Sequence, residues 1–304
     1  MKKQKQLLVL TALSLATGAA MAQANDTLAR IKSSGVVNLG VRDSSGLAFT
    51  IGGGKYVGFH TEMAERIIDD LSKQAGKPLK INYQVITSQN RVPLVQNGTI
   101  DFECGSTTNN AARQKDVAFA VTTFVDEVRT AVKTSSGIKS VNDLNGKTVA
   151  VTTGTTSVQH LRRHERGANI DFKTVQGKDH ADSFLLLESG RADAFVMDGS
   201  ILAASISKAK NPKDFAIVGE VLSVEPIACM LRKDDPKMKE ALDNSIKRQI
   251  KDGSLAKLYD KWFMQPIPPN NVALNMPLNE STKAAWATPN DKPAEAYSSK
   301  LLAK

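Results

Sequence analysis

Cysteine, histidine and aromatic residues are scarce in this sequence. Its 304 residues include two Cys, four His and only 5% Phe, Trp and Tyr. Two cysteines are too few for a metal cluster, and the four histidines show none of the spacings typical of metal ligands. The glycine triplet at 52–54 lacks the spacing of a phosphate-binding loop. We therefore predict no metal and no cofactor.

Long apolar runs are missing outside the N-terminus. The chain starts Met-Lys-Lys-Gln-Lys, continues with an apolar run at 7–20 and then reads Ala22-Gln23-Ala24. This order is typical of a cleaved signal peptide, so we assign residues 1–24 to one. The pair Ala20 and Ala22 leaves a second cleavage site open. A membrane anchor is disfavoured because the run is shorter than the roughly 18 apolar residues that span a bilayer, and no Cys stands nearby to carry a lipid.

Acidic charge is in modest deficit, which gives a net charge of +9. Three lysines of this excess belong to the predicted signal peptide. The other Lys and Arg are scattered among Asp and Glu, without the interleaved aromatic residues of a nucleic-acid-binding surface. We therefore expect no nucleic-acid partner, and a solvated surface that attracts small acidic ligands.

The two cysteines are Cys104 and Cys229. An exported chain enters an oxidising compartment, where disulfides form and persist. Spacing alone does not fix the geometry that a bridge needs. A disulfide and two buried free thiols therefore both remain open.

The stretch 87–113 concentrates hydroxyl, amide and guanidinium groups between apolar runs. We predict a short helix at 94–97 closed by Gly98, a buried strand at 99–104, a polar loop, and a second helix containing Arg113. A strand end followed by free N–H groups, hydroxyls and a guanidinium suits a carboxylate, and Arg91 adds a second cation. Taken singly, the same residues are ordinary caps and turns, and that alternative stays open.

Two other strand ends carry polar groups. The strand predicted at 36–41 delivers Arg42 to a loop, where ligands of open α/β sheets bind. The strand at 148–152 ends in Thr153-Gly154-Thr155-Thr156-Ser157 at a helix start, which is a second potential anion cradle.

Strand and helix patterns alternate along the rest of the chain. A unit of helix, glycine, two residues, aspartate and strand occurs around Gly98 and Asp101, and again around Gly190 and Asp193. This repeat favours two lobes of similar build. We expect further strands at 79–85, 117–120, 124–133, 172–175, 194–197 and 221–232, a hairpin at 49–58, and helices at 25–34, 61–74, 182–189, 238–251 and 255–263.

The fold class that follows is α/β, with two lobes that are each a twisted sheet flanked by helices. The chain leaves the first lobe near residue 126 and returns near residue 225, so two strands cross between the lobes and act as a hinge. We place the first lobe at 25–125 and 227–269, the second at 129–223, the hinge at 126–128 and 224–226, and a C-terminal extension of low order at 270–304.

The sequence resembles the periplasmic solute-binding proteins of ABC importers, in the polar amino-acid class. The resemblance covers about 27–269 and is strongest for the glutamate- and aspartate-binding members. It is carried by residues 87–110, by Gly-Arg-Ala-Asp-Ala-Phe at 190–195, by Leu-Asn-Gly-Lys at 144–147 and by Leu-Arg-Lys-Asp-Asp-Pro at 231–236. It implies the type II binding-protein fold.

The resemblance also implies ligand contacts. Arg113 matches the arginine that clamps the α-carboxylate, and Asp198 matches the acid that takes the α-ammonium. Ser106 and Thr108 match the donors beside that arginine, and Thr152 and Thr155 match contacts from the second lobe. The groups around the side-chain carboxylate of the ligand are matched by Arg42, Ser88, Arg91 and His180. Each also has an ordinary structural interpretation, as a surface ion pair, helix cap or turn residue.

The implied function is that of a non-catalytic, monomeric receptor in the periplasm. L-glutamate or L-aspartate enters the crevice, the lobes close, and the closed form docks on an inner-membrane ABC permease. One alternative is an exported enzyme on the same scaffold, similar to cyclohexadienyl dehydratase, for which His180 and Glu103 are the candidate acid–base groups. Another is a binding partner of a chemoreceptor.

Overall fold

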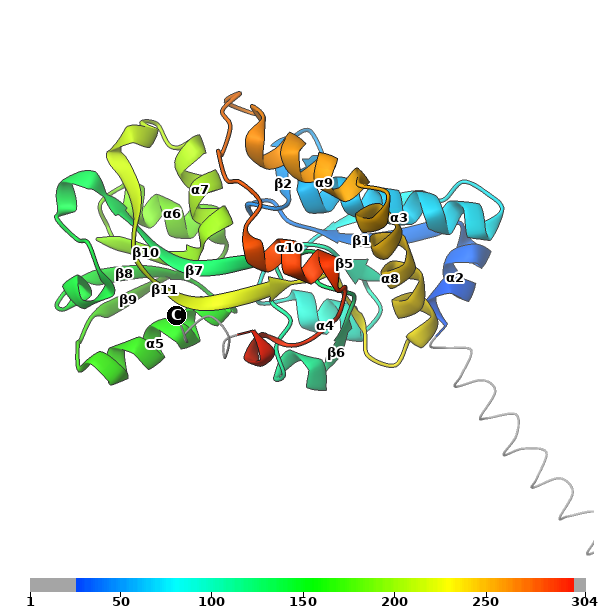
Figure 1. The fold of residues 1–304 in the computed structure, drawn as a ribbon, viewed down its shortest axis with the longest axis horizontal. Helices are drawn as coiled ribbons and strands as arrows, with labels where there is room; N and C mark the ends of the chain where they lie inside the picture. The colour runs from blue at the N-terminus through cyan, green and yellow to red at the C-terminus, as the bar shows by residue number, and fades with distance from the viewer. Residues whose placement is uncertain (1–25, 298–304) are drawn as a thin grey trace, which may run out of the picture.

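The computed structural model describes residues 26–297, and the predicted signal peptide lies outside them. Two α/β lobes lie side by side, each built on its own five-stranded sheet (Figure 1). Within the described residues no helix combines the length and the hydropathy that a membrane crossing needs. The predicted two-lobe α/β fold is confirmed.

The first lobe holds the sheet with strand order β4-β1-β5-β12-β6. Strand β1 pairs in parallel with β4 and β5, while β12 pairs antiparallel with β5 and β6. The strands are β1 (Val36–Val41), β4 (Lys80–Val85), β5 (Phe102–Glu103), β6 (Val117–Phe119) and β12 (Met230–Arg232). The helices of this lobe are α2 (Thr27–Ser34), α3 (Phe59–Ala75), α4 (Arg91–Gln96), α8 (Pro236–Lys251) and α9 (Ser254–Tyr259), and a hairpin of β2 (Phe49–Gly52) and β3 (Lys55–Val57) completes it.

The second lobe holds the sheet with strand order β11-β7-β10-β8-β9. Strand β8 pairs in parallel with β9 and β10, and β7 pairs antiparallel with β10 and β11. The strands are β7 (Phe124–Lys133), β8 (Thr148–Thr152), β9 (Lys173–Gly177), β10 (Ala194–Asp198) and β11 (Phe215–Ile227). The helices are α5 (Thr156–Ala168), α6 (His180–Glu188) and α7 (Gly199–Lys208).

The repeat seen in the sequence is also a structural repeat. The N–H of Asp101 donates to the carbonyl of Asn38 at 2.8 Å, and its carboxylate accepts from the N–H of Asn38 at 2.7 Å. Asp193 makes the same pair of bonds with Thr148, at 2.7 and 2.8 Å. In each lobe, therefore, an aspartate fixes the start of the central strand, β5 or β10, against a parallel neighbour, β1 or β8, and this part of the two sheets is built alike.

Strands β7 and β11 connect the lobes. Phe124, at the start of β7, lies in the core of the first lobe, whereas Val128 lies in the core of the second. Residues 223–227 of β11 pair antiparallel with residues 124–128 of β7, so the crossing is a two-stranded ribbon. The single strand predicted at 221–232 is wrong, because β11 ends at Ile227 and a separate strand, β12, follows. Ala228 and Cys229 bond to the first lobe instead, and β12 begins after them.

Two predictions around the polar stretch also need correction. The strand expected at 99–104 is shorter than predicted and consists of β5 alone, Phe102–Glu103. It starts late because the N–H of Ile100 bonds back to the carbonyl of Leu94 in α4. The helix expected around Arg113 is a single 3₁₀ turn, Arg113–Lys115. Strand β6 starts two residues later, which leaves no length for an α-helix.

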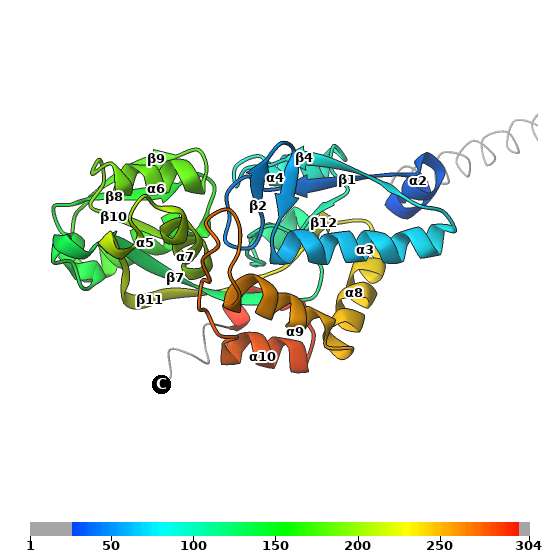
Figure 2. The same ribbon diagram turned by 90° about the horizontal axis from the view of Figure 1, so that it is seen from above.

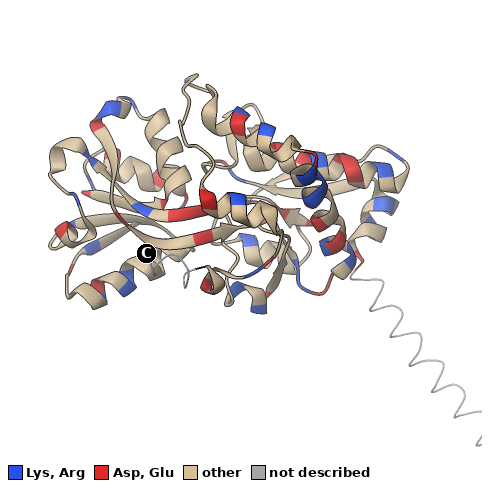
Figure 3. Ribbon diagram, in the orientation of Figure 1, with Lys and Arg blue, Asp and Glu red and all other residues tan. Residues whose placement is uncertain are grey.

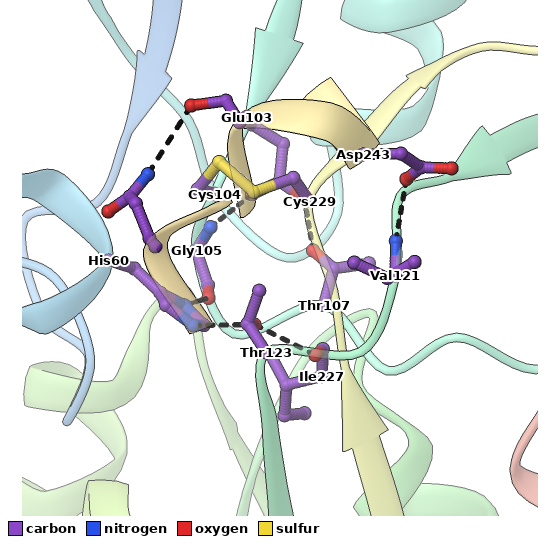
Figure 4. Close-up of a disulfide and its surroundings, with 12 residues drawn as sticks. His60, Glu103, Cys104, Gly105, Thr107, Val121, Thr123, Ile227, Cys229 and Asp243 are labelled. Carbon is purple, nitrogen blue, oxygen red and sulfur yellow. Dashed lines mark hydrogen bonds between the residues drawn. A yellow bond between two sulfur atoms is a disulfide. The ribbon is translucent and has the colours of Figure 1, made fainter. Parts of the chain in front are cut away.

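A disulfide joins Cys104 to Cys229, which the sequence left open (Figure 4). It links the residue after β5 to the residue before β12. His60 lies beside it, with Nδ1 2.6 Å from the carbonyl of Gly105 and Nε2 2.8 Å from Oγ1 of Thr123. Burial lowers the pKa of His60 to about 4, so the imidazole is neutral at physiological pH. The loop after β5 is thus fixed both covalently and by hydrogen bonds.

The prediction of low order after residue 270 is wrong for the described part of that segment. Helix α10 (Glu280–Ala287) packs along β7, beside α9 (Figure 2). Asn279 donates to the carbonyl of Val125 at 2.8 Å, and Thr282 accepts from the N–H of Val125 at 3.0 Å. The polar composition of the segment hid these contacts because they satisfy backbone groups of a strand far away in the sequence.

Trp286 anchors this helix, and its replacement by alanine is expected to destabilise the protein. Its side chain is buried, its Nε1 donates to the carbonyl of Thr123 at 2.9 Å, and its ring meets Tyr259 edge-on. We expect the free energy of unfolding in urea to fall by about 3–5 kcal/mol. Leu185→Ala, at a side chain 57% exposed, is the control and should change it by less than about 0.5 kcal/mol. Equal effects would mean that α10 is not anchored here.

Candidate functional site

The predicted site residues lie at the facing edges of the two lobes. From the first lobe, the end of β1 supplies Arg42, the start of α4 supplies Arg91, and the loop after β5 supplies Ser106 and Thr108. From the second, the ends of β8 and β10 supply Thr152 and Asp198, and the start of α6 supplies His180. The carboxyl ends of parallel strands meet at one edge of each sheet, which is why residues so distant in sequence converge.

Arg42 forms a chain of contacts that crosses between the lobes. Its guanidinium is buried and donates to Oγ of Ser88 at 3.1 Å and to Nε2 of His180 at 3.0 Å. The other ring nitrogen of His180 lies 3.1 Å from Oγ1 of Thr152. Burial lowers the pKa of His180 well below its usual value, and the charges of Arg42 and Arg91 lower it further. His180 is therefore a neutral acceptor that holds Arg42 in place.

Arg91 is held from behind by the loop after β5. It donates to Oγ1 of Thr107 at 2.6 Å and to the carbonyl of Ser106 at 3.3 Å. Thr107 in turn donates to the carboxylate of Glu103, whose other oxygen accepts from the N–H of Gly105 at 2.6 Å. Burial lowers the pKa of Arg91, and the nearby charge of Arg113 lowers it further, yet a guanidinium stays protonated in proteins.

Arg113 and Asp198 face the site from opposite lobes. Arg113 donates to the carbonyl of Thr108 at 2.8 Å in its own lobe and to the carbonyl of Gly154 at 3.3 Å in the other. The pKa of Asp198 is raised well above its usual value by burial and by the carboxylates of Asp126 and Glu225, while Arg91 and Arg113 oppose the shift. A cationic partner at Asp198 would remove much of that penalty.

Several buried polar atoms at this site have no hydrogen-bond partner within the described part of the chain. They are Nη1 of Arg42, Nε of Arg91, Oγ of Ser106 and Oδ1 of Asp198. Leaving one buried polar group unpaired costs about 1–3 kcal/mol, and native proteins keep few such groups. Guanidinium and hydroxyl donors on one side and a carboxylate on the other are complementary to a ligand that carries carboxylates and an ammonium.

The lobes touch around the site, so the structure is a closed form. Besides the contacts of Arg42 and Arg113, Oγ1 of Thr108 lies 3.4 Å from Oγ1 of Thr156. Gly154 approaches the backbone of Ser88 and Gln89 so closely that an added Cβ would lie 2.8 Å from it. Thr155, a predicted contact, donates its hydroxyl to the carbonyl of Thr152 at 2.8 Å and shapes the turn before α5.

Sequence reasoning missed some groups that build the site. Thr107 stands between two predicted contacts, so its position in the hydroxyl run was the available signal. Helix α7, which follows Asp198 directly, was also missed, although Ile201, Leu202 and Ala204 form its buried side.

Charges of both signs are interspersed over both lobes (Figure 3), as the scattered sequence pattern predicted.

The arrangement supports binding better than proton transfer. Nε2 of His180 already accepts from Arg42, and both oxygens of Glu103 are occupied. A general base needs a free basic atom within reach of the substrate. Among residues 26–297 no three His, Cys, Asp or Glu side chains gather in an arrangement suited to a metal ion.

Comparison with known proteins gives the family. The model of the bacterial extracellular solute-binding proteins, family 3, matches residues 37–265. The glutamate/aspartate import solute-binding protein of Escherichia coli K12 is 44% identical over 92% of this chain and 96% of its own. The L-glutamate/L-aspartate-binding protein of Pseudomonas aeruginosa is 43% identical over 88% of this chain and 90% of its own.

A solved structure carries the same fold. An ancestral amino-acid-binding protein, described as a precursor of cyclohexadienyl dehydratase, matches with a TM-score of 0.68 and 29% identity, over 78% of this chain and 99% of its own. The family model spans most of both lobes, and the relatives match nearly end to end. The chain therefore belongs to family 3 of the bacterial extracellular solute-binding proteins.

Proposed function

We propose that this protein binds L-glutamate or L-aspartate between its lobes in the periplasm and delivers it to an inner-membrane ABC permease. The observation that carries the proposal is the set of unpartnered buried atoms, guanidinium and hydroxyl donors facing one carboxylate. A ligand with two carboxylates and one ammonium carries groups complementary to them. The names of the two bacterial relatives support the same ligands.

The proposed roles are those that the resemblance to the family implies. Arg113, with Ser106 and Thr108, holds the α-carboxylate, and Asp198 holds the α-ammonium. Arg42 and Arg91 face the side-chain carboxylate, and bidentate pairing of a guanidinium with a carboxylate gives both strength and direction. The remaining predicted contacts are Ser88, Thr152, Thr155 and His180.

We also propose that the lobes, at 25–125 with 227–269 and at 129–223, rotate about the ribbon at 126–128 and 224–226. Closure would shield the charged pairs from water, and a ligand that contacts both lobes shifts the equilibrium towards the closed form. The described C-terminal segment, which bonds to Val125 beside that ribbon, would move with the first lobe.

Isothermal titration calorimetry tests the binding. The protein is unfolded, dialysed and refolded to remove any carried-over ligand, and then titrated with glutamate, aspartate and glutamine. We expect one site per chain with at least tenfold preference for an acidic amino acid over glutamine. Absence of saturable binding would refute the receptor function, and turnover of a cyclic carboxylate would favour the enzyme alternative instead.

Arg91→Ala is expected to erase the preference for acidic ligands. Removing one partner of a buried ion pair costs 2–5 kcal/mol, so we expect affinity for glutamate to fall about 100-fold, while affinity for glutamine changes less than tenfold. Calorimetry with both ligands measures these affinities. Arg91→Lys keeps the charge, so its affinity for glutamate should lie between those of the wild type and Arg91→Ala. Equal losses for glutamate and glutamine would contradict the proposed role of Arg91.

A further inference from the structure

A loop of the first lobe touches the second lobe outside the predicted ligand contacts. This loop, residues 43–50, runs from the end of β1 into the first two residues of β2 and contacts α6 and α7. Oγ of Ser44 accepts from the N–H of Ala181 at 3.2 Å. Nζ of Lys208 lies 3.8 Å above the ring of Phe49, which is within cation–π range.

The tightest of these contacts is made by Gly46. A Cβ added at this position would lie 2.3 Å from the carbonyl oxygen of Ser200, 2.4 Å from its carbon and 2.8 Å from the nitrogen of Ile201. All three are backbone atoms in the first turn of α7, so no side-chain rotation relieves the overlap. Gly46 does not have a left-handed φ. The contact, and not the backbone conformation, is therefore what requires a glycine here.

The surface that Gly46 meets is itself fixed to the crossing ribbon. The carboxylate of Asp126, in β7, accepts from the N–H of Ser200 at 3.2 Å and from its hydroxyl at 2.5 Å. Asp198 ends β10 immediately before α7. The turn that Gly46 touches is thus rigidly connected to the carboxylate proposed to hold the ligand ammonium.

The loop is also held by contacts within its own lobe. Oγ of Ser45 accepts from the N–H groups of Leu47 at 3.2 Å and of Ala48 at 3.0 Å. The side chains of Leu47 and Phe49 are buried in the core of the first lobe. A loop fixed to one lobe and fitted to the other loses little conformational entropy when the lobes meet.

We propose that residues 43–50 form a latch that stabilises the closed form, and that Gly46 is the residue that permits it to engage. The latch rests on the proposed function, because it acts on the closure that ligand binding drives. It makes Gly46 a determinant of affinity without any contact to the ligand. The coupling is reciprocal, since whatever favours closure also favours ligand binding.

Gly46→Ala tests the latch, with Gly167→Ala as the matched control. An added Cβ at Gly167, in α5, meets nothing within 4 Å. Overpacking typically weakens a contact enough to lower an equilibrium constant about 5- to 150-fold. We expect a loss in that range for glutamate with Gly46→Ala and none with the control. The melting temperature of ligand-free Gly46→Ala should match that of the wild type, and that of Gly167→Ala should equal or exceed it, because alanine favours a helix more than glycine does.

Small-angle X-ray scattering supplies the conformational readout. Saturating glutamate should reduce the radius of gyration of the wild type and of Gly167→Ala, and reduce that of Gly46→Ala less at equal ligand concentration. Ser44→Ala, which removes only the acceptor of the Ala181 N–H, gives a second and milder variant, and we expect a few-fold weaker affinity. Wild-type affinity and closure in both latch variants would overturn the proposal.

The outcome also separates the latch from the proposed function. If the wild type binds and closes while Gly46→Ala does the same, the latch is wrong and the function stands. If the wild type binds no amino acid, the function falls. The latch rests on that function and is then rejected with it, whereas wild-type behaviour of Gly46→Ala rejects the latch alone.

Discussion

Arg113→Ala is expected to abolish the binding of every amino acid, with affinity falling roughly 1000-fold or more. All amino acids share the α-carboxylate that Arg113 is proposed to hold, and truncating one partner of a buried charge pair costs 2–5 kcal/mol. Arg113 also connects the lobes, through the carbonyls of Thr108 and Gly154. The variant therefore loses a ligand contact and a closure contact together.

Calorimetry with glutamate, aspartate and glutamine measures the loss for each ligand. Arg166→Ala makes the same change of charge at an exposed position late in α5 and should leave all affinities unchanged. Arg113→Lys keeps the charge but not the planar fork of donors, so its affinities should be intermediate. Binding of glutamate by Arg113→Ala within tenfold of the wild type would contradict the assignment.

The contrast with Arg91 gives the prediction its specificity. Arg91 lies in the first turn of α4 and is held by Thr107 and the carbonyl of Ser106, without a bond to the second lobe. Its loss should affect acidic ligands selectively, whereas the loss of Arg113 affects all ligands. If the Arg91 variant lost all ligands and the Arg113 variant lost only acidic ones, Arg91 would hold the α-carboxylate and Arg113 the side-chain carboxylate.

Much of the fold could be predicted because local patterns decided it. Strands β1, β7 and β8 begin and end at the predicted residues, since each is an apolar or alternating run followed by turn residues. The repeat around Asp101 and Asp193 predicted the shared build of the lobes, and in both lobes the aspartate bonds to a parallel neighbouring strand, β1 or β8.

The failures have long-range causes. The backbone groups of Val125 that Asn279 and Thr282 satisfy lie more than 150 residues away, so nothing local distinguished α10 from a polar tail. The split between β11 and β12 depends on the chain passing from one lobe to the other, where Ala228 bonds to the carbonyl of Thr107. A continuous apolar run cannot reveal that it serves two sheets.

The sequence indicated candidate site residues but not the side chains that support them. Strand ends and the hydroxyl loop pointed to Arg42 and Arg91, and the family resemblance pointed to Asp198. All three lie at the facing edges of the lobes, and their ligand contacts stay predictions. The path from Glu103 through Thr107 to Arg91 was hidden, because Glu103 looked like one more residue of a buried strand. Its role depends on where a loop turns back over the strand end.

Asp198→Asn is expected to separate binding from stability. Asparagine has nearly the shape of aspartate but no charge, so the ligand ammonium loses its buried counter-ion, and affinity for glutamate should fall about 1000-fold. The ligand-free protein should not be weakened. Burial and the carboxylates of Asp126 and Glu225 raise the pKa of Asp198, so ionising it in the folded protein is unfavourable.

The sign of the pH effect follows from that shift. A carboxyl whose pKa is higher in the folded than in the unfolded state binds more protons when folded, so its contribution to stability decreases as pH rises above the unfolded value near 4. Asp198→Asn removes this penalty. Its melting temperature should therefore equal or exceed that of the wild type at pH 7, and the difference should shrink towards pH 4.

Thermal unfolding of both ligand-free proteins between pH 4 and 8 measures the effect. Asp171→Asn, an exposed aspartate of the second lobe, makes the same chemical change outside the site and should alter neither affinity nor the pH profile. Loss of binding with a large loss of stability would mean that Asp198 is a structural residue. Retained binding would place the ligand ammonium elsewhere. The proposed site, in which three guanidiniums and one carboxylate bind the ligand, would then be wrong.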